Sequence, residues 1–311
     1  MLLAVTLNPS VDISYRLDDL KLDDVNRAAE VRKTAGGKGL NVARVAHLLG
    51  ADVISTGVLG GSLGDYIERL LDQDGMKHQF LHTNQEARNC IAILHEQKQT
   101  EILESGPHLT KADQDRFLYH FRSLLQGISV ITISGSIVSG FATRVYSQMI
   151  EIANEKQIPV LLDTSGETLK ASLQNKRALP YLIKPNASEL RQLLNRSIAI
   201  NPSEWQEALS HPIFSDVPWV VVSKGADGAF ARHQHNFYRV KIPKIQAVNP
   251  VGSGDATVAG LAKAIEMNLN DEGVLKYGMA AGLLNAMEAQ TGYVDASKFD
   301  HYASLVEVQK E

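Results

Sequence analysis

The sequence predicts an α/β protein of three layers, α/β/α, with a mainly parallel central sheet and a small antiparallel β lid. Short apolar, β-rich runs alternate with amphipathic helical patterns along most of the 311 residues, and the chain after residue 254 is mostly helical. Two regions, 11–33 and about 79–104, instead alternate polar and apolar residues without a helical pattern. Unbroken apolar strands separated by helices are typical of a parallel sheet covered on both faces.

The expected elements follow this alternation in order. Strand-like runs lie at 2–7, 53–58, 130–133, 160–163, 181–183 and 219–223. Amphipathic stretches lie near 39–49, 62–73, 111–126, 141–156 and 187–195. Helices between consecutive strands indicate parallel pairing, and the helices after residue 254 would complete the layer over the sheet.

The segments 11–33 and 79–104 are expected to form the lid. Alternation of polar and apolar residues favours antiparallel strands with one solvated face. The chain contains no internal repeat, low-complexity tract or linker-like composition. We therefore expect a single domain over residues 1–311, with the lid as its appendage.

Charge and composition exclude several classes of protein. The formal net charge is −4, with 44% hydrophobic and 21% charged residues, so no global basic field favours nucleic acid. No apolar run approaches the roughly 20 residues that span a bilayer. The N-terminal run indicates a first strand rather than a signal peptide. Cys90 is the single cysteine, so no internal disulfide is expected, and we expect a cytoplasmic protein without nucleic-acid or membrane partners.

A glycine-rich segment directly precedes the helical pattern near the C-terminus, with the sequence Asn249-Pro250-Val251-Gly252-Ser253-Gly254-Asp255-Ala256-Thr257. Glycines let backbone N–H groups converge, and a helix start adds unpaired N–H groups and the positive end of the dipole. A phosphate is expected to rest there with the Asp255 carboxylate beside it, which suggests phosphoryl transfer to a hydroxyl group. The alternative is an ordinary turn into a capped helix, since aspartate is common at helix N-termini.

A second glycine-rich loop, Gly36-Gly37-Lys38-Gly39-Leu40-Asn41, also opens a helical pattern. The glycines permit close backbone approach, and Lys38 offers a charge that attracts phosphate. The loop is not a P-loop, because glycine follows Lys38 in place of serine or threonine and the upstream spacing differs. The combination of glycines, a lysine and an asparagine favours a binding loop over a simple tight turn.

A third polar loop, Lys184-Pro185-Asn186-Ala187-Ser188-Glu189, follows the strand that ends at Ile183. Ligands bind beyond the carboxyl ends of the strands in open α/β sheets. Asn186 and Glu189 lie on one side of the first helical turn, a spacing that suits Mg²⁺ held largely through water. A capping box between the same two residues explains the spacing equally and is favoured on this segment alone.

Two more loops follow strands at the same edge of the sheet. The segment 223–228 could cradle nucleotide phosphates or form a hairpin turn, and the segment 134–136 follows the strand at 130–133. Each loop is weak by itself, and their convergence on one face indicates a binding site. Asp12 lies just beyond the first strand, where it could accept hydrogen bonds from sugar hydroxyls. Arg27 and Arg88 lie in the lid segments, and a guanidinium group matches a phosphate well.

These motifs together resemble a known family. The motifs are Asn8-Pro9-Ser10-Val11-Asp12, Gly36-Gly37-Lys38-Gly39-Leu40-Asn41-Val42-Ala43-Arg44, Lys184-Pro185-Asn186 and Val251-Gly252-Ser253-Gly254-Asp255. In this order, over residues 1 to about 295, they resemble the PfkB branch of the ribokinase-like sugar kinases. Within that branch the chain is most similar to tagatose-6-phosphate kinases and next to 1-phosphofructokinases, and the segments 100–107 and 249–257 favour the former. The resemblance implies a ribokinase-like fold, ATP, Mg²⁺ and a homodimer formed through the lid.

The resemblance also implies roles for individual residues. Asp255 would be the base, and the backbone of Gly252, Ser253 and Gly254 would stabilise charge on the transferred phosphoryl group. The sugar phosphate would be bound by Asp12, Arg27, Gly36, Gly37, Lys38, Asn41, Arg88 and Ser136. The ATP site would be lined by Lys184, Asn186, Ser223, Gly225, Gly228 and Asn285, and Glu189 would act on Mg²⁺ through water.

The leading hypothesis is an ATP-dependent kinase that converts D-tagatose 6-phosphate into D-tagatose 1,6-bisphosphate. Fructose 1-phosphate and then fructose 6-phosphate are alternative substrates, because epimers that differ at one hydroxyl are hard to separate by sequence. Two departures from the family adjoin the expected sugar pocket. Ala35 stands where a proline often precedes the paired glycines, and Ile137-Val138 stands where Pro-Pro often occurs.

Two hypotheses of other classes have less support. A Rossmann-type oxidoreductase needs Gly-x-Gly-x-x-Gly after its first strand, whereas this strand leads into Asn8-Pro9-Ser10. A test for NAD binding would decide that case. A non-catalytic sugar-phosphate sensor would need neither Asp255 nor the paired glycines, and tight sugar-phosphate binding without ADP formation would favour it.

Overall fold

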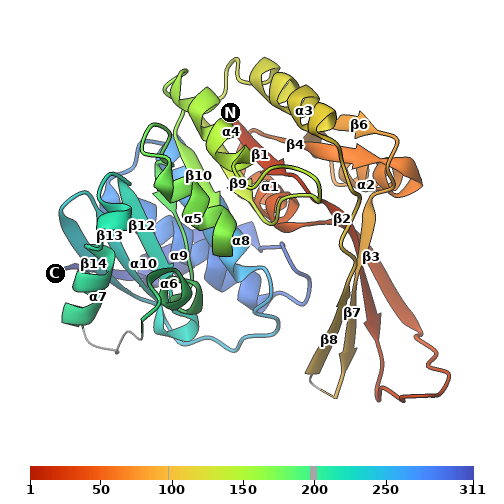
Figure 1. Cartoon of the computed structure of the whole chain (residues 1–311). Coiled ribbons are helices and arrows are strands. Elements are labelled where there is room, and N and C mark those ends of the chain that lie inside the picture. Colours follow the sequence, from red (N-terminus) through yellow and green to blue (C-terminus); the bar gives the residue numbers. More distant parts are fainter. Residues whose placement is uncertain (97, 197–201) are drawn as a thin grey trace.

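The computed structural model describes residues 1–96, 98–196 and 202–311. A large sheet with helices on both faces forms the main body, and a smaller sheet projects from one side of it (Figure 1). The predicted fold class is therefore confirmed. Across the described residues, every helix is too short or too polar to span a bilayer.

The large sheet is parallel over most of its width. Its strands are β1 (Leu2–Thr6), β4 (Val53–Gly60), β5 (Lys77–His78), β6 (Leu81–Thr83), β9 (Val130–Ser134), β10 (Val160–Asp163), β11 (Leu182–Ile183), β12 (Trp219–Ser223), β13 (Ala229–His233), β14 (Asn236–Lys241) and β15 (Glu307–Lys310). They lie in the order β15-β14-β13-β12-β11-β10-β9-β1-β4-β5, and β6 also pairs with β4. All pairs from β12 to β5 are parallel, and the pairs from β12 to β15 are antiparallel.

Helices bury an apolar face on each side of this sheet. One side carries α1 (Lys38–Leu48), α2 (Gly61–Gln73), α8 (Ser253–Glu266), α9 (Asp271–Met287) and α10 (Phe299–Leu305). The other carries α3 (Lys111–Ser123), α4 (Val145–Asn154), α5 (Gly166–Gln174), α6 (Ala187–Leu194) and α7 (Pro202–Leu209). Side chains alternate across a strand, so Leu2 and Ala4 of β1 pack in the first core and Leu3 and Val5 in the second.

The lid is a four-stranded sheet made of two hairpins. Its strands are β2 (Ser10–Arg16), β3 (Glu30–Gly36), β7 (Arg88–His95) and β8 (Lys98–Leu103), in the order β3-β2-β7-β8. Each hairpin is antiparallel, as expected, and the two central strands, β2 and β7, pair in parallel. The second lid segment begins at Arg88 rather than near residue 79, because residues 81–83 form β6 and pair with β4 of the main sheet.

The expected strands and helices appear close to their expected positions. The differences are at short elements. The helices α5 and α7 were not expected, and α5 places only Leu169 and Leu173 as large apolar residues in the core, which gives a weak helical signal. The strand β15 was not expected either, because its sequence Glu307–Lys310 is polar and its pairing with β14 is set by distant residues. Three short 3₁₀ helices lie at Pro212–Phe214, Gly225–Asp227 and Ala296–Lys298.

Candidate active site

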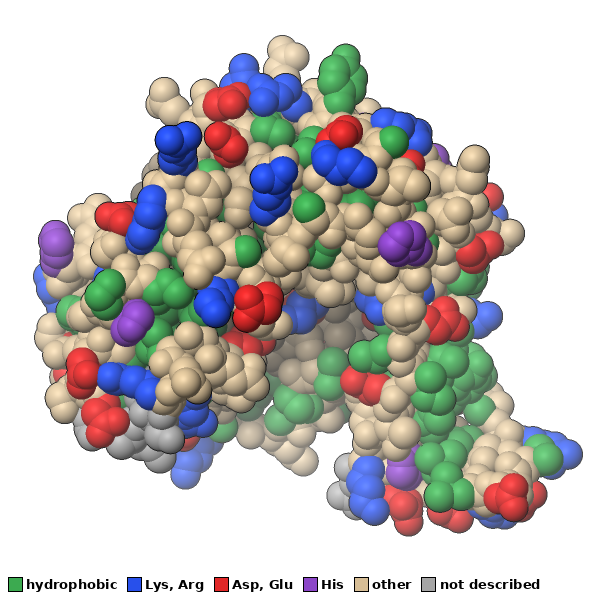
Figure 2. Space-filling view, in the orientation of Figure 1, with side chains coloured by type: hydrophobic (Ala, Val, Ile, Leu, Met, Phe, Trp, Pro, Cys, Tyr) green, Lys and Arg blue, Asp and Glu red, His purple; other side chains and the backbone are tan. Residues whose placement is uncertain are grey.

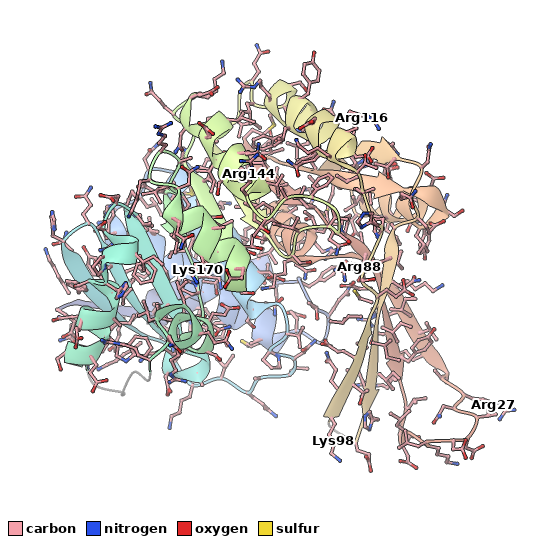
Figure 3. The ribbon with its side chains drawn as sticks, in the orientation of Figure 1. Arg27, Arg88, Lys98, Arg116, Arg144 and Lys170 are labelled. Carbon is pink, nitrogen blue, oxygen red and sulfur yellow. The ribbon has the colours of Figure 1, made fainter. Side chains whose placement is uncertain are left out.

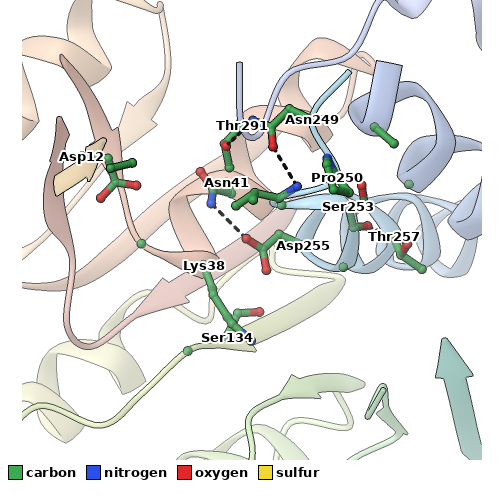
Figure 4. A pocket seen from close by; sticks show the side chains of 18 of the residues that line it. Asp12, Lys38, Asn41, Ser134, Asn249, Pro250, Ser253, Asp255, Thr257 and Thr291 are labelled. Atoms are coloured by element: carbon green, nitrogen blue, oxygen red, sulfur yellow. Dashed lines mark hydrogen bonds between the residues drawn. The ribbon is translucent and has the colours of Figure 1, made fainter. Parts of the chain in front are cut away.

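A cavity of about 1460 Å³ lies where the carboxyl ends of the parallel strands face the lid. Figure 2 shows the surface hollowed between the main body and the lid, and Figure 4 shows the interior. The predicted site residues along its wall are Asp12, Gly37, Lys38, Asn41, Arg88, Ser136, Lys184, Asn186, Glu189, Ser223, Gly225, Gly252, Ser253, Gly254 and Asp255. The cavity lining does not include Arg27, Gly36, Gly228 or Asn285.

The start of α8 presents unpaired backbone N–H groups to this cavity. Gly252 is the N-cap residue with φ of 82°, a left-handed conformation that favours glycine, and no side chain caps the helix. Ser253 N–H bonds to Pro250 O, whereas the N–H groups of Gly254 and Asp255 bond to no described residue. Unpaired N–H groups at the positive end of a helix dipole attract a phosphate.

Asp255 lies in the first turn of α8, buried and directed toward the cavity (Figure 4). Asp255 is only 6% exposed. Its Oδ2 accepts a hydrogen bond of 2.9 Å from Asn41 Nδ2. Burial, together with the charge of Asp163, raises the pKa of Asp255 to about 6. The carboxylate of Asp255 therefore binds a proton more readily than an ordinary aspartate does.

Asp163 pairs with two lysines in the part of the cavity that also contains Asp255. Asp163 Oδ1 lies 3.5 Å from Lys184 Nζ, and its Oδ2 lies 3.9 Å from Lys38 Nζ. The carboxylate of Asp163 raises the pKa of Lys38. A Cβ added at Gly254 would lie 3.3 Å from Lys184 Nζ, so this ammonium group lies against the start of α8. Asp163 thus contacts both ammonium groups, and that of Lys184 also lies beside the start of α8.

Asp163 is not among the site residues expected from the sequence. A signal was present, because Asp163 is the last residue of the expected strand at 160–163 and therefore lies at the same carboxyl edge as the other polar loops. A carboxylate at that edge has to be neutralised, and only the folded structure shows that Lys38 and Lys184 do so.

Asp12 occupies the opposite wall of the cavity, on lid strand β2 (Figure 4). Ser10 Oγ donates to Asp12 Oδ1 at 2.6 Å, and burial raises the pKa of Asp12. Gly36 lies behind this carboxylate, since a Cβ added there would lie 1.9 Å from Asp12 Cγ. Gly36 therefore leaves space for Asp12 and does not line the cavity itself.

The two lid arginines have different positions. Arg88 lies at the base of the lid and contributes to the cavity, and its guanidinium donates to Asn8 O and Glu104 O. Arg27 is exposed at the far end of the lid (Figure 3). The structure thus separates Arg27 from the other predicted phosphate ligands, because the β2–β3 hairpin carries it away from the main body.

The predicted ATP-site residues also divide into two groups. Lys184, Asn186, Ser223 and Gly225 line the cavity. Gly228 ends the turn after β12, and its N–H bonds to Gly225 O. Asn285 is fully buried, donating to Val251 O and Ser253 Oγ and accepting from Gly292 N–H. It supports the loop before α8 from behind, and its amide is occupied by these contacts.

Asn186 and Glu189 form the capping box that the sequence allowed. Asn186 Oδ1 accepts from the N–H groups of Ser188 and Glu189, and Glu189 Oε2 accepts from Asn186 N–H at 2.8 Å. Within the described residues, Glu189 Oε1 takes part in no hydrogen bond or ion pair. Glu189 lines the cavity, so this oxygen fits an Mg²⁺ ion that keeps most of its water ligands.

Comparisons with known proteins agree with this geometry. The model of the pfkB family of carbohydrate kinases matches residues 5–297.

The chain belongs to the PfkB family of carbohydrate kinases.

Solved structures of similar proteins cover nearly all of this PfkB-family kinase. Phosphofructokinase-2 from Escherichia coli, in complex with potassium, is 25% identical with a TM-score of 0.90, covering 97% of this chain and 98% of that one. A protein provisionally described as a phosphofructokinase from Staphylococcus aureus is 27% identical with a TM-score of 0.86, covering 100% and 99%. A possible 1-phosphofructokinase from Thermotoga maritima, 23% identical with a TM-score of 0.87 and covering 100% and 99%, shows the same fold. The chain is thus a carbohydrate kinase of the PfkB family, a family whose activity implies the use of ATP.

Proposed function

We propose that this kinase transfers the γ-phosphoryl group of ATP to the 1-hydroxyl of D-tagatose 6-phosphate. One observation carries the reaction type: the Asp255 carboxylate lies beside the uncapped N-terminus of α8 and faces the cavity that Asp12 closes from the lid. A base, an anion site and a sugar-binding carboxylate therefore surround one space. The choice of tagatose rests on the segments 100–107 and 249–257.

In the proposed reaction, the O–H bond of the sugar breaks as its oxygen bonds to the γ-phosphorus. Asp255 accepts the proton, and the bond from the γ-phosphorus to the bridging oxygen of ADP breaks. The N–H groups of Gly254 and Asp255 and the ammonium of Lys184 lie where they can stabilise charge on the transferred group. Phosphoryl transfer depends mainly on such positioning and charge neutralisation. Mg²⁺ would neutralise charge on the ATP phosphates, with Glu189 as its contact on the protein.

The sugar phosphate would lie between Asp12 and Asp255. Asp12 would accept hydrogen bonds from sugar hydroxyls, and Lys38, Arg88 and Ser136 would face its existing phosphate. The names of the similar structures favour fructose phosphates as the second candidate, either fructose 6-phosphate or fructose 1-phosphate. These substrates would use the same base and the same anion site.

An assay that couples ADP release to NADH oxidation tests this proposal. Tagatose 6-phosphate, fructose 6-phosphate and fructose 1-phosphate are compared at equal concentrations with ATP and Mg²⁺. We expect the highest kcat/KM with tagatose 6-phosphate. A higher kcat/KM with either fructose phosphate would move the assignment to that substrate, and absence of ADP release with tight sugar-phosphate binding would indicate a sensor.

We also propose that the chain forms a homodimer through the lid. One face of the lid exposes the large apolar side chains of Val31 and Ile102, which the strand pairing places on the same side of the sheet, opposite to the cavity-lining Leu103. Hydrophobic side chains gather on the lid in Figure 2. Such a patch on a projecting sheet favours a protein interface. In a dimer of this kind, Arg27 could serve a phosphate only in the partner subunit's cavity, since it lies far from its own.

A further inference from the structure

Arg44 is a buried cation on α1 that contacts several separate segments of the chain. The residue is 2% exposed. Its Nη2 donates to Ala35 O of lid strand β3, and its Nη1 donates to Asn41 Oδ1 at 3.2 Å. Its Nε lies 3.4 Å from Asp74 Oδ2, and its Cζ lies 5.2 Å from the centroid of the Tyr293 ring. The residue lies outside the cavity lining and is not among the site residues expected from the sequence.

The contact between Arg44 and Asn41 fixes which way the Asn41 amide faces. A guanidinium group only donates hydrogen bonds, so it can contact only the oxygen end of an amide. The nitrogen end of Asn41 then faces Asp255 Oδ2, at 2.9 Å. A reversed amide would set its NH₂ against the guanidinium and its oxygen against the carboxylate, two repulsive contacts in a buried site.

The backbone of Gly292 closes this contact from the side. A Cβ added at Gly292 would lie 2.8 Å from Asn41 Oδ1 and 3.0 Å from Arg44 Nη1. The space around the Asn41 amide oxygen is therefore filled by the guanidinium of Arg44 and by the backbone of Gly292. An alternative rotamer of Asn41 has little room on that side.

We propose that Arg44 is a positioning residue that locks the Asn41 amide, so that its NH₂ group always donates to the base Asp255. The inference rests on the proposed function, in which Asp255 accepts the proton of the sugar hydroxyl. Arg44 acts only through Asn41, since its own guanidinium contacts Asn41 Oδ1 and not the carboxylate.

The charged groups around Asp255 determine the direction of the expected effect. Asp255 is faced by Lys38 on α1, by Lys184 after β11 and by Asp163 at the end of β10. Burial and Asp163 raise its pKa, whereas Lys38, the Asn41 hydrogen bond and Lys184 lower it. Loss of the Asn41 hydrogen bond would therefore shift the titration of Asp255 to higher pH.

The test follows the titration of Asp255 directly, by ¹³C NMR of the substrate-free protein labelled at the aspartate carboxyl carbons. Asp255→Asn identifies the resonance. The variants are Arg44→Lys, Asn41→Ala and the double variant. Lysine lacks the planar fork that reaches Ala35 O and Asn41 Oδ1 together. We expect the midpoint to rise by about one pH unit in each single variant, with no further rise in the double variant.

Two controls separate this role from general structural support. Tyr293→Phe keeps the ring over the guanidinium and should leave the midpoint unchanged. If Arg44→Lys does not fold, Arg44→Gln replaces it, because a single amide also cannot reach both acceptors, and the same upward shift is expected. In active variants, the acid limb of kcat/KM should move by the same amount as the NMR midpoint.

An unchanged midpoint in a folded Arg44 variant would overturn the inference. It would also be overturned if the Arg44 shift persisted in the Asn41→Ala background, because Arg44 would then act by another route. The NMR titration needs no turnover. A wild-type protein without kinase activity would therefore contradict the proposed function and still leave this test decisive.

Discussion

Asp163 and Lys184 form a buried ion pair that joins the end of β10 to the turn after β11. Asp163 Oδ1 lies 3.5 Å from Lys184 Nζ, and each side chain is only 4% exposed. Lys184 Nζ also lies against Gly254 at the start of α8. Asp163 therefore positions the lysine that lies beside the start of α8, and it contributes to the raised pKa of Asp255.

Replacing Asp163 by asparagine should destabilise the fold, because it leaves the buried Lys184 ammonium without a counter-charge. We expect a loss of about 3–5 kcal/mol in the free energy of unfolding. Urea unfolding measures this loss. The matched control is Asp216→Asn, which breaks an exposed pair with Lys176 and should cost less than about 1 kcal/mol. Equal losses in the two variants would show that the buried pair stabilises the fold no more than an exposed pair does.

Gly36→Ala should weaken binding of the sugar phosphate. The new Cβ would overlap the Asp12 carboxylate, 1.9 Å from its Cγ, and would force that side chain away from its present position. We expect KM for the sugar phosphate to rise about tenfold, or about 1.4 kcal/mol, with KM for ATP nearly unchanged. Steady-state kinetics against each substrate measures the split. Gly64→Ala on α2, where the nearest atom to the new Cβ is 3.3 Å away, should change neither value.

Asp255 should make the stability of the protein fall as the pH rises. Its pKa is about 6 in the folded protein against an ordinary value of 3.8. The folded state therefore binds the proton more tightly, and this contribution to stability is complete below about pH 4 and lost as the pH rises through 6. Asp255→Asn removes the buried charge, so it should be more stable than the wild type at pH 7.5 but not at pH 4. Urea unfolding at both pH values measures this, and a less stable variant at pH 7.5 would contradict it.

An acidic side chain on the exposed strand of the lid should separate the proposed dimer. Ile102 is 54% exposed on β8, and an aspartate there would place a charge in an apolar interface. We expect Ile102→Asp to sediment as a monomer at concentrations where the wild type is a dimer. Tyr119→Asp, on α3 at a residue 79% exposed, should leave the dimer intact. A wild-type protein that sediments as a monomer would exclude the dimer.

The fold was predictable because its signals are local. Apolar strands such as 130–133 and 160–163 and the helices between them are each encoded within about ten residues. The pairing of β2 with β7 was not predictable, because it joins segments more than seventy residues apart and depends on how both hairpins leave the main sheet. The pairing of β6 with β4 of the main sheet was not predictable either, because it also depends on contacts between distant segments.

The candidate site was predictable where a motif marks a strand end or a helix start. Asn186 follows β11, the glycine-rich segments with Lys38 and Asp255 open α1 and α8, and the structure brings all three to one cavity. The rest depends on three-dimensional contacts. Asn285 lies within an apolar helix pattern, and that pattern does not show that its amide contacts the loop before α8. Arg27 lies on a hairpin whose direction no local pattern sets, and Arg44 gains its contacts only when the segments around Ala35, Asp74 and Tyr293 pack together.

We propose that Asp255 is the base of this kinase, and the turnover of Asp255→Asn is the decisive test of that role. Asparagine keeps the shape of the side chain and can still accept the Asn41 hydrogen bond, but it cannot accept a proton. We expect kcat to fall at least about a hundredfold, with ATP affinity by calorimetry unchanged. A variant that keeps more than a tenth of the wild-type kcat would show that Asp255 is not the base.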